Sequence, residues 1–179
     1  EAIWSGKVVN ITENRQALHP ALRGSRDSFF PENIMNEVTK QKKQMLKIAE
    51  GVRNGNIKSH SGKKYTSVLA IGIGGSDLGP RMSVKALTPF KGNINVRFVS
   101  NIDPSDLINA TDDLDPSRTL VIVSSKTFTT IETLTNAKAA FNWLAKNIGE
   151  IGAKNQQYAI TSNFDNAKIF GFDATKILL

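Results

Sequence analysis

The chain has 179 residues, with 23 Lys and Arg against 16 Asp and Glu, and it contains no cysteine. Its length suits one domain with a real core, and the lack of cysteine excludes a disulfide framework, a thiol nucleophile and a thiolate metal site. No segment approaches the roughly 18 consecutive apolar residues of a membrane-spanning helix, so we expect a cytoplasmic protein. Because the chain lacks an initiator Met and ends on an apolar run, we also expect it to be a piece of a longer protein.

The net charge of +7 is concentrated between residues 36 and 65, where eight Lys or Arg accompany two Glu. Apolar residues recur at helical spacing through the same stretch, among them Ile34, Val38, Met45, Ala49 and Val52, so the charges are interpreted as the solvated face of a helix. No aromatic residues lie among these charges to stack on bases, and no zinc or RNA-binding signature is present. A basic nucleic-acid-binding protein is therefore the third and least favoured hypothesis.

Further along the chain, strand and helix patterns alternate. A long helix is predicted from about residue 33 to residue 54, closed by Gly55. Strands are predicted over residues 67–73, 95–100, 119–124 and 157–162, and helices over about residues 78–87, from Pro104, over 130–147 and over 166–170. Continuous apolar strands separated by helices predict a doubly wound α/β fold, a parallel sheet with helices on both faces and its strand-end loops at one edge. Residues 1–32 are expected to form an N-terminal arm and residues 33–179 one domain.

The first loop of interest, Gly72-Ile73-Gly74-Gly75-Ser76, follows the first predicted strand. A dinucleotide fingerprint would need glycine where Asp77 stands, and the phosphate loop of nucleotide hydrolases would need Lys and a hydroxyl residue where Pro80-Arg81 stand. What remains is a tight turn in which the N–H groups of Gly75 and Ser76, and the Ser76 hydroxyl, can approach an anion or a sugar oxygen. A turn that requires positive φ and binds nothing is the alternative.

The second loop follows the strand predicted over residues 119–124 and comprises Ser125, Lys126, Thr127, Phe128, Thr129 and Thr130. Thr129 and Glu132 fit a capping box at the start of the next helix. Four hydroxyls and one ammonium at the positive end of a helix dipole make a phosphate cradle. Capping alone explains Thr129 and Glu132 but not Lys126, because a cation near a helix N-terminus is unfavourable without an anion. The predicted ligand is a phosphorylated small molecule.

The remaining polar residues give no convincing proton-transfer base and no metal site. His19 and His60 lack a second His or a carboxylate at ligand spacing and are interpreted as structural or solvated. Asp77 follows the first loop, and Asp103 is expected to cap the helix that opens at Pro104. We therefore predict no catalytic residue and no metal ion within this chain.

Three longer strings of residues lie at the ends of predicted strands. They are Ile71-Gly72-Ile73-Gly74-Gly75-Ser76-Asp77-Leu78-Gly79-Pro80, Phe98-Val99-Ser100-Asn101-Ile102-Asp103 and Ser125-Lys126-Thr127-Phe128-Thr129-Thr130, with Glu132-Thr133 and Thr135-Asn136-Ala137 after the last. In sequence and in order these strings resemble the glucose-6-phosphate isomerase family. Shorter strings at residues 10–15 and 18–23 resemble its N-terminal arm, and residues 170–173 its segment after the fourth strand, so the resemblance covers nearly the whole chain. The run at residues 103–106 and Ser124 depart from the common pattern.

The resemblance implies the first of that family's two sugar-isomerase domains, a five-stranded parallel sheet in a three-layer αβα arrangement, with the second domain absent from this chain. It implies that Gly75 and Ser76 line the sugar and that Ser125, Lys126, Thr127 and Thr130 hold the phosphate. We take Phe128 and Thr129, inside the same loop, as further candidate binding residues. Apolar surface is expected to be exposed, because the family packs this domain against a second one and against a partner subunit.

The activity implied is the reversible conversion of glucose 6-phosphate to fructose 6-phosphate, in glycolysis and gluconeogenesis, by a cytoplasmic homodimer without metal or redox cofactor. The family's glutamate base, its ring-opening histidine and an arginine and lysine near the sugar would lie beyond residue 179. We therefore expect the chain alone to be inactive, and expect no nucleic-acid or membrane partner. A stand-alone phosphosugar-binding regulatory module without catalysis is the alternative.

Overall fold

The computed structural model describes residues 2–24 and 30–179. The chain divides into two compact units, Glu1–Lys47 and Ile48–Leu179, and the division falls inside the long helix α1 (Glu32–Asn54). The helix ends where it was predicted to, and Gly55 follows with φ of 78°. The division expected after residue 32 remains a prediction.

The smaller unit contains an antiparallel pair of short strands, β1 (Val8–Asn10) and β2 (Arg15–Gln16), and a short 3-10 helix, η1 (His19–Arg23). Its core consists of Ala21, Phe30 and Met35, and the Trp4 ring meets the Phe30 ring edge-on at 5.5 Å. The lysines of α1 in this unit are exposed, as expected of a solvated face. Met45 and Ala49, expected on the packed face, are exposed as well.

The larger unit is built on a five-stranded sheet in the order β4-β3-β5-β6-β7, in which every pairing is parallel. The chain therefore starts in β3, adds β4 on one side, and returns across β3 to continue with β5 on the other. This reversal makes the junction of β3 and β5 a topological switch point. The strands are β3 (Ser67–Ile71), β4 (Asn95–Val99), β5 (Thr119–Ser124), β6 (Gln157–Ile160) and β7 (Ile177–Leu178).

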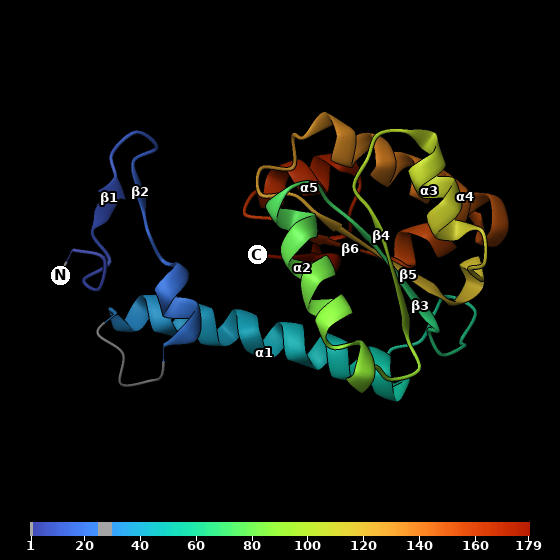
Figure 1. The fold of residues 1–179 in the computed structure, drawn as a ribbon, viewed down its shortest axis with the longest axis horizontal. Helices are drawn as coiled ribbons and strands as arrows, with labels where there is room; N and C mark the ends of the chain where they lie inside the picture. Colours follow the sequence, from blue (N-terminus) through green and yellow to red (C-terminus); the bar gives the residue numbers. More distant parts are fainter. Residues whose placement is uncertain (1, 25–29) are drawn as a thin grey trace. The chain divides into compact units, whose positions relative to one another are not determined.

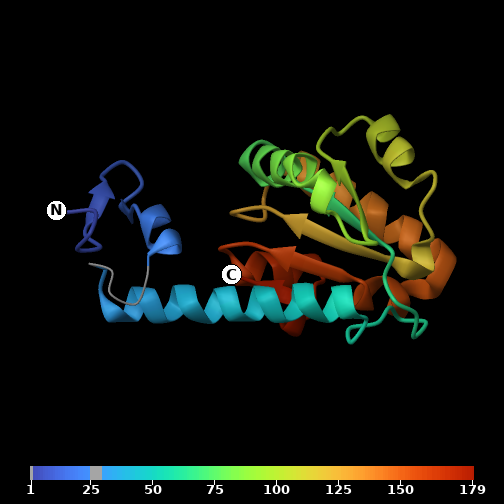
Figure 2. The same ribbon diagram turned by 60° about the horizontal axis from the view of Figure 1, so that its bottom comes forward.

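Helices cover both faces of this sheet (Figure 1, Figure 2). Right-handed crossovers in the observed strand order put α3, α4 and α5 on one face and α2 on the other. One core lies under α3, α4 and α5, and a second core joins the end of α1 to the opposite face through Val52, Leu120 and Tyr158. This arrangement confirms the predicted doubly wound α/β fold. The helices are α2 (Gly75–Ala86), α3 (Pro104–Thr111), α4 (Ile131–Asn155) and α5 (Phe164–Phe170), with short 3-10 turns η2 (Thr88–Phe90), η3 (Pro116–Arg118) and η4 (Ala174–Lys176).

Two element boundaries differ from those predicted. The helix α2 begins at Gly75 rather than near residue 78, so Gly75 and Ser76 lie in its first turn and not in a preceding loop. The helix α4 runs on to Asn155, but Gly149 interrupts it with φ of 76° and ψ of 163°. The predicted end at residue 147 thus comes close to this break, and the helix resumes beyond it.

A buried glutamine joins three segments at the amino-terminal edge of the sheet. The Gln156 side chain is fully buried, its Nε2 donates to the carbonyls of Pro116 and Thr119 at 2.8 Å each, and its Oε1 accepts the His60 N–H at 3.0 Å. The neighbouring Gln157 is also buried, but its Nε2 has no hydrogen-bond partner among the described residues. The amide nitrogen of Gln156 is therefore satisfied, whereas that of Gln157 is not.

We predict that Gln156→Leu lowers the free energy of unfolding by roughly 2–4 kcal/mol. The substitution takes the side-chain partner from the His60 N–H and the Thr119 carbonyl, and it leaves the Pro116 carbonyl with the Thr119 N–H alone. Gln157→Leu serves as the matched control and should cost less than about 1 kcal/mol, or stabilise, because it removes an amide nitrogen that is already unsatisfied. Urea denaturation of the two variants measures the difference. Equal losses would contradict the role assigned to Gln156.

Candidate functional site

The two predicted loops lie side by side at the switch point. Ile71, the last residue of β3, pairs with Val123 near the end of β5, so both strands end at the same level. The chain leaves β3 through Gly72 and leaves β5 through Ser125. In open α/β sheets the crevice at this point is where small ligands bind. The sheet thus brings together the two segments that the sequence singled out.

The first loop turns sharply into α2, and its glycines serve different purposes. A Cβ at Gly72 would stand 2.8 Å from the Ser76 carbonyl oxygen, so only glycine fits there. Gly74 has φ of 58° and ψ of −121° and begins the helix, whereas a Cβ at Gly75 would meet open space. The Ser76 N–H donates to the Ile73 carbonyl at 3.1 Å. Ser76 can therefore offer a ligand its hydroxyl but not the N–H that we had also expected it to supply.

An ion pair fixes the first turn of α2 to the end of β4. The Asp77 carboxylate is buried and accepts hydrogen bonds from Arg81 Nε and Nη2, at 3.0 and 2.8 Å. The same guanidinium donates to the Ser100 hydroxyl at 3.1 Å and lies 5.0 Å from the centre of the Phe98 ring. A carboxylate engaged in this way is poorly suited to abstract a proton. Asp77 acts instead as a support beneath Gly75 and Ser76.

The second loop is anchored from below by a phenylalanine in a left-handed conformation. Phe128 has φ of 54°, and its buried ring meets those of Phe170 and Phe172 edge-on at 5.7 and 5.6 Å. A non-glycine residue with positive φ is uncommon and needs such support from its surroundings. Of the candidate binding residues, Phe128 could therefore contact a ligand only through its backbone. The sequence signal for this anchoring role was a single aromatic residue among hydroxyl residues.

Hydrogen bonds from the segment after β6 orient the backbone of the second loop. The Lys126 carbonyl accepts the Ser162 N–H and both the Thr161 and Ser162 hydroxyls, and the Thr127 carbonyl accepts Asn166 Nδ2 at 2.9 Å. In a trans peptide the N–H points opposite to the carbonyl. The N–H groups of Thr127 and Phe128 therefore point away from the segment after β6. In the sheet, β3 and its loop lie on the other side of β5 from β6.

The start of α4 differs from the predicted capping box. The N-cap residue is Thr130, which makes no side-chain cap hydrogen bond, and the helix begins at Ile131. The third helical residue is thus Thr133 rather than Glu132, so the reciprocal bond expected from Glu132 was a wrong prediction. Because no side chain caps them, the first N–H groups of α4 can bind an anion, which the helix dipole also favours.

Hydroxyl groups pair beside this helix start. The Ser125 and Thr130 hydroxyls are 3.5 Å apart, and those of Thr127 and Thr129 are 2.7 Å apart. Together with Lys126 they combine donors and a positive charge in one short loop. Donors of this kind suit a phosphate group, whose oxygens accept several charge-assisted hydrogen bonds at once.

Comparison with known proteins shows the family. The family model described as phosphoglucose isomerase matches residues 1–179. The chain belongs to the phosphoglucose isomerase family. It is 45% identical over 172 residues to a glucose-6-phosphate isomerase of Caulobacter sp. (strain K31) and 42% identical over 180 residues to that of Rhizobium leguminosarum bv. trifolii, matches that cover 94% and 99% of this chain.

A crystal structure of a glucose-6-phosphate isomerase from Chlamydia trachomatis superposes with a TM-score of 0.73 at 26% identity, over 99% of this chain and 33% of that one. The Caulobacter and Rhizobium proteins are covered over only 32% and 33% of their lengths. The chain therefore spans about a third of the relatives it matches.

Three other polar residues named from the sequence lie outside the two loops. Asp103 caps α3 by accepting the Ser105 N–H at 2.9 Å, and the Ser105 hydroxyl and then this N–H lower the pKa of its carboxyl. His60 is exposed at the opposite edge of the sheet, beside Asn155. His19 is exposed in the smaller unit. None of these residues joins the two loops.

One positioning residue was missed by the sequence reasoning. Asn136 is buried on α4, and its Nδ2 donates to the Asn101 carbonyl at 2.7 Å, which ties the loop after β4 to α4. The only sequence signal was a polar residue in the middle of a helical apolar stripe. The loop after β4 is thus connected to both α2 and α4, the helices that follow the two candidate loops.

Among the residues that the structure describes, no group of three or more His, Cys, Asp or Glu side chains gathers so that it could hold a metal ion. No helix in residues 2–24 and 30–179 has the length and apolar character needed to cross a membrane.

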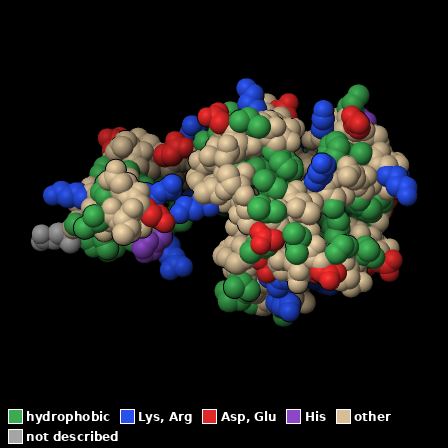
Figure 3. Space-filling model, turned by 90° about the horizontal axis from the view of Figure 1, so that it is seen from above, with side chains coloured by type: hydrophobic (Ala, Val, Ile, Leu, Met, Phe, Trp, Pro, Cys, Tyr) green, Lys and Arg blue, Asp and Glu red, His purple; other side chains and the backbone are tan. Residues whose placement is uncertain are grey.

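Apolar side chains surround the edge where the loops meet. Leu78 in α2 is 67% exposed, and Ile131 at the start of α4 is 73% exposed. Ile102, after β4, is also exposed. Figure 3 shows such hydrophobic side chains lying between charged ones on the surface of the larger unit. This exposure agrees with the expectation for a phosphoglucose isomerase fragment.

We predict that Arg81→Met lowers the free energy of unfolding by about 2–4 kcal/mol, because it leaves the buried Asp77 carboxylate unpaired. Arg97→Met is the matched control, since Arg97 forms its ion pair with Asp113 at an exposed position, and it should cost about 0–1 kcal/mol. Denaturant unfolding of both variants checks the ranking. A loss for Arg81→Met no larger than for Arg97→Met would show that the pair does not hold α2 in place.

Proposed function

We propose that this chain is the phosphate-binding part of a glucose-6-phosphate isomerase, which interconverts glucose 6-phosphate and fructose 6-phosphate. Membership of the phosphoglucose isomerase family supports the reaction class. The observation that carries the proposal is the start of α4, which no side chain caps and which lies beside the loop of Ser125, Lys126, Thr127 and Thr130 at the switch point of the sheet.

Each loop has its own task in this proposal. The phosphate binds to the loop after β5, through the hydroxyls, the Lys126 ammonium, the N–H groups of Thr127 and Phe128 and those of the first turn of α4. The sugar extends toward Gly75 and the Ser76 hydroxyl. Because the phosphate is attached at C6, fixing it limits where C1 and C2 lie relative to a base, and such positioning can supply a large part of a rate enhancement.

The base itself comes from outside residues 1–179 in this proposal. The isomerisation moves a proton between C2 and C1 through an enediol and is redox neutral, so it calls for a base and for ring opening rather than for a redox cofactor. Near the loops, Asp77 is neutralised by Arg81 and Asp103 caps a helix. A general base needs a carboxylate or imidazole free to reach the substrate proton.

The wider biological assignments belong to the same proposal. As a glucose-6-phosphate isomerase, the whole protein would act in glycolysis and gluconeogenesis, in the cytoplasm, as a homodimer of chains with two sugar-isomerase domains. It would need no nucleic-acid or membrane partner. The names of the curated relatives support the reaction, and the exposed apolar residues around the loops support packing against a further protein surface.

Lys126→Ala in the full-length enzyme should weaken binding of glucose 6-phosphate by about 1.5–3 kcal/mol, or roughly 10- to 150-fold, the usual loss for a charge-assisted bond. Lys138→Ala, an exposed lysine on α4, is the matched control and should leave binding unchanged. Steady-state kinetics and inhibition by inorganic phosphate measure both. An unchanged Michaelis constant and unchanged phosphate inhibition in Lys126→Ala would refute the assignment of this loop.

Residues 1–179 alone should show no conversion of fructose 6-phosphate above background, yet should bind glucose 6-phosphate at about millimolar affinity, since a single anion site supplies only about 4 kcal/mol. Chemical shifts of Gly75, Ser76 and residues 125–130 should move during an NMR titration with the sugar phosphate. Turnover near that of an intact isomerase would place the base within this chain. Binding without turnover by the full-length protein would instead favour the regulatory phosphosugar-binding module.

A further inference from the structure

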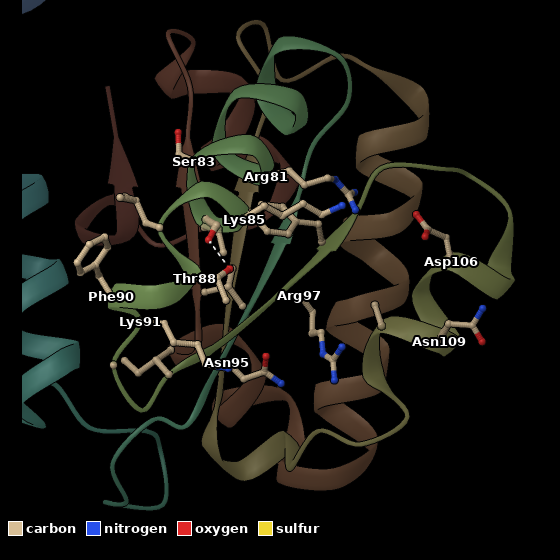
Figure 4. Close-up of a pocket in the computed structure, with 17 residues that line it drawn as sticks. Arg81, Ser83, Lys85, Thr88, Phe90, Lys91, Asn95, Arg97, Asp106 and Asn109 are labelled. Atoms are coloured by element: carbon tan, nitrogen blue, oxygen red, sulfur yellow. Dashed lines mark hydrogen bonds between the residues drawn. The ribbon is translucent and has the colours of Figure 1, made fainter.

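A groove of about 680 Å³ runs along the free edge of the sheet, away from the phosphate loops. The strand β4 forms its floor, because β4 is the outermost strand and pairs only with β3. Figure 4 shows α2 on one side of this strand, with Arg81 and Lys85, and α3 on the other, with Asp106 and Asn109. The groove therefore has two walls of side chains and a floor of strand backbone.

The backbone of β4 is unpaired at two residues. The Asn95 N–H donates to the Thr66 carbonyl at 2.8 Å, and the Val99 carbonyl accepts the Gly72 N–H at 3.2 Å, so the odd-numbered residues of β4 pair with β3. In a parallel ladder alternate residues direct their backbone groups to opposite sides. The N–H and carbonyl groups of Val96 and Phe98 therefore point out of the sheet, into the groove.

This open edge has neither a bulge nor a proline to block strand addition. The five residues of β4 pair with β3 in unbroken register, without a bulge, and none of them is proline. Natural proteins commonly protect a free edge by such bulges or prolines. Beyond Phe98 the edge closes, because the Asp106 carboxylate accepts the N–H groups of Ser100 and Asn101 at 2.8 and 2.9 Å. The free backbone is thus a short window centred on Val96 and Phe98.

Among the described residues that line the groove, the charged side chains that form no ion pair or hydrogen bond are lysines, so the groove offers positive charge to a ligand. Arg81 is paired with Asp77, Arg97 is paired with Asp113, and Asp106 is occupied by two N–H groups. Lys85 and Lys91 also line the groove, and neither forms an ion pair within the described part of the chain. Both lie on the α2–η2 wall, so side chains facing that wall would meet two ammonium groups.

We propose that the β4 edge binds an extended acidic peptide segment of a partner protein, which joins the sheet as a sixth strand. Four backbone hydrogen bonds to Val96 and Phe98 would hold it, in the manner of strand addition to a sheet edge. Alternate side chains of such a strand face opposite walls, so acidic residues at every second position meet Lys85 and Lys91. Isomerase activity does not enter this inference, because the groove lies outside both phosphate loops.

The probe is a ten-residue peptide of alternating Glu and Val, with a fluorescent label on its N-terminus and an amidated C-terminus; the full-length protein is titrated into it, with fluorescence anisotropy as the readout. Lys85→Glu and Lys91→Glu should each weaken its binding about 5- to 10-fold, whereas the exposed Lys138→Glu on α4 should not. A peptide of alternating Lys and Val should bind at least about 10-fold more weakly than the acidic one. Equal binding of the two peptides would overturn the proposal.

A second variant separates strand pairing from simple charge attraction. Val96→Pro removes an N–H that β3 does not use, as proline can at an edge strand, and should abolish binding of the acidic peptide. Hydrogen exchange of the segment containing Val96 and Phe98 should slow only when the peptide is added to the unmodified protein. Full binding by Val96→Pro would overturn strand addition, and protection before the peptide is added would show that the protein's own chain already covers the edge.

Discussion

The parallel pairing of β3 with β5 is the constraint on which the candidate site depends. These strands are neighbours in space although β4 and α3 separate them in the chain, and their register places Ile71 beside Val123. Because the crossovers leave β3 in one direction and β5 in the other, no helix covers the ends of both strands. The two loops that follow can therefore face the same ligand, and neither loop alone would surround a phosphate and a sugar.

The loops are held in place by contacts that do not involve a ligand. Below the second loop, Phe128 packs against two other aromatic rings, and its neighbouring carbonyls bond to the segment after β6. Below the first, Asp77 and Arg81 join α2 to the end of β4. Groups fixed in advance lose little conformational freedom when a ligand binds. The donors of the candidate site are thus held by the fold itself.

The fold could be predicted from the sequence because its signals are local. Each strand of the sheet core is a continuous apolar run, and Gly55 and Pro104 mark a helix end and a helix start. The details of the site depend on registers of a single residue and on tertiary contacts. The start of α4 at Ile131 moved Glu132 out of the capping box, and the start of α2 at Gly75 gave the Ser76 N–H a partner within the turn. Gln156 and Asn136 became visible as connectors only once distant segments were seen together.

In the proposed function a phosphate binds at the start of α4, beside the loop after β3. A crystal structure of the full-length protein with glucose 6-phosphate would show whether it does. We expect the phosphate oxygens within hydrogen-bond distance of the Ser125, Thr127 and Thr130 hydroxyls and of the first N–H groups of α4, with the sugar near Gly75 and Ser76. A phosphate bound elsewhere, for example between Lys85 and Lys91 in the β4 groove, with the loop at residues 125–130 making no contact, would show that this loop is not the phosphate site.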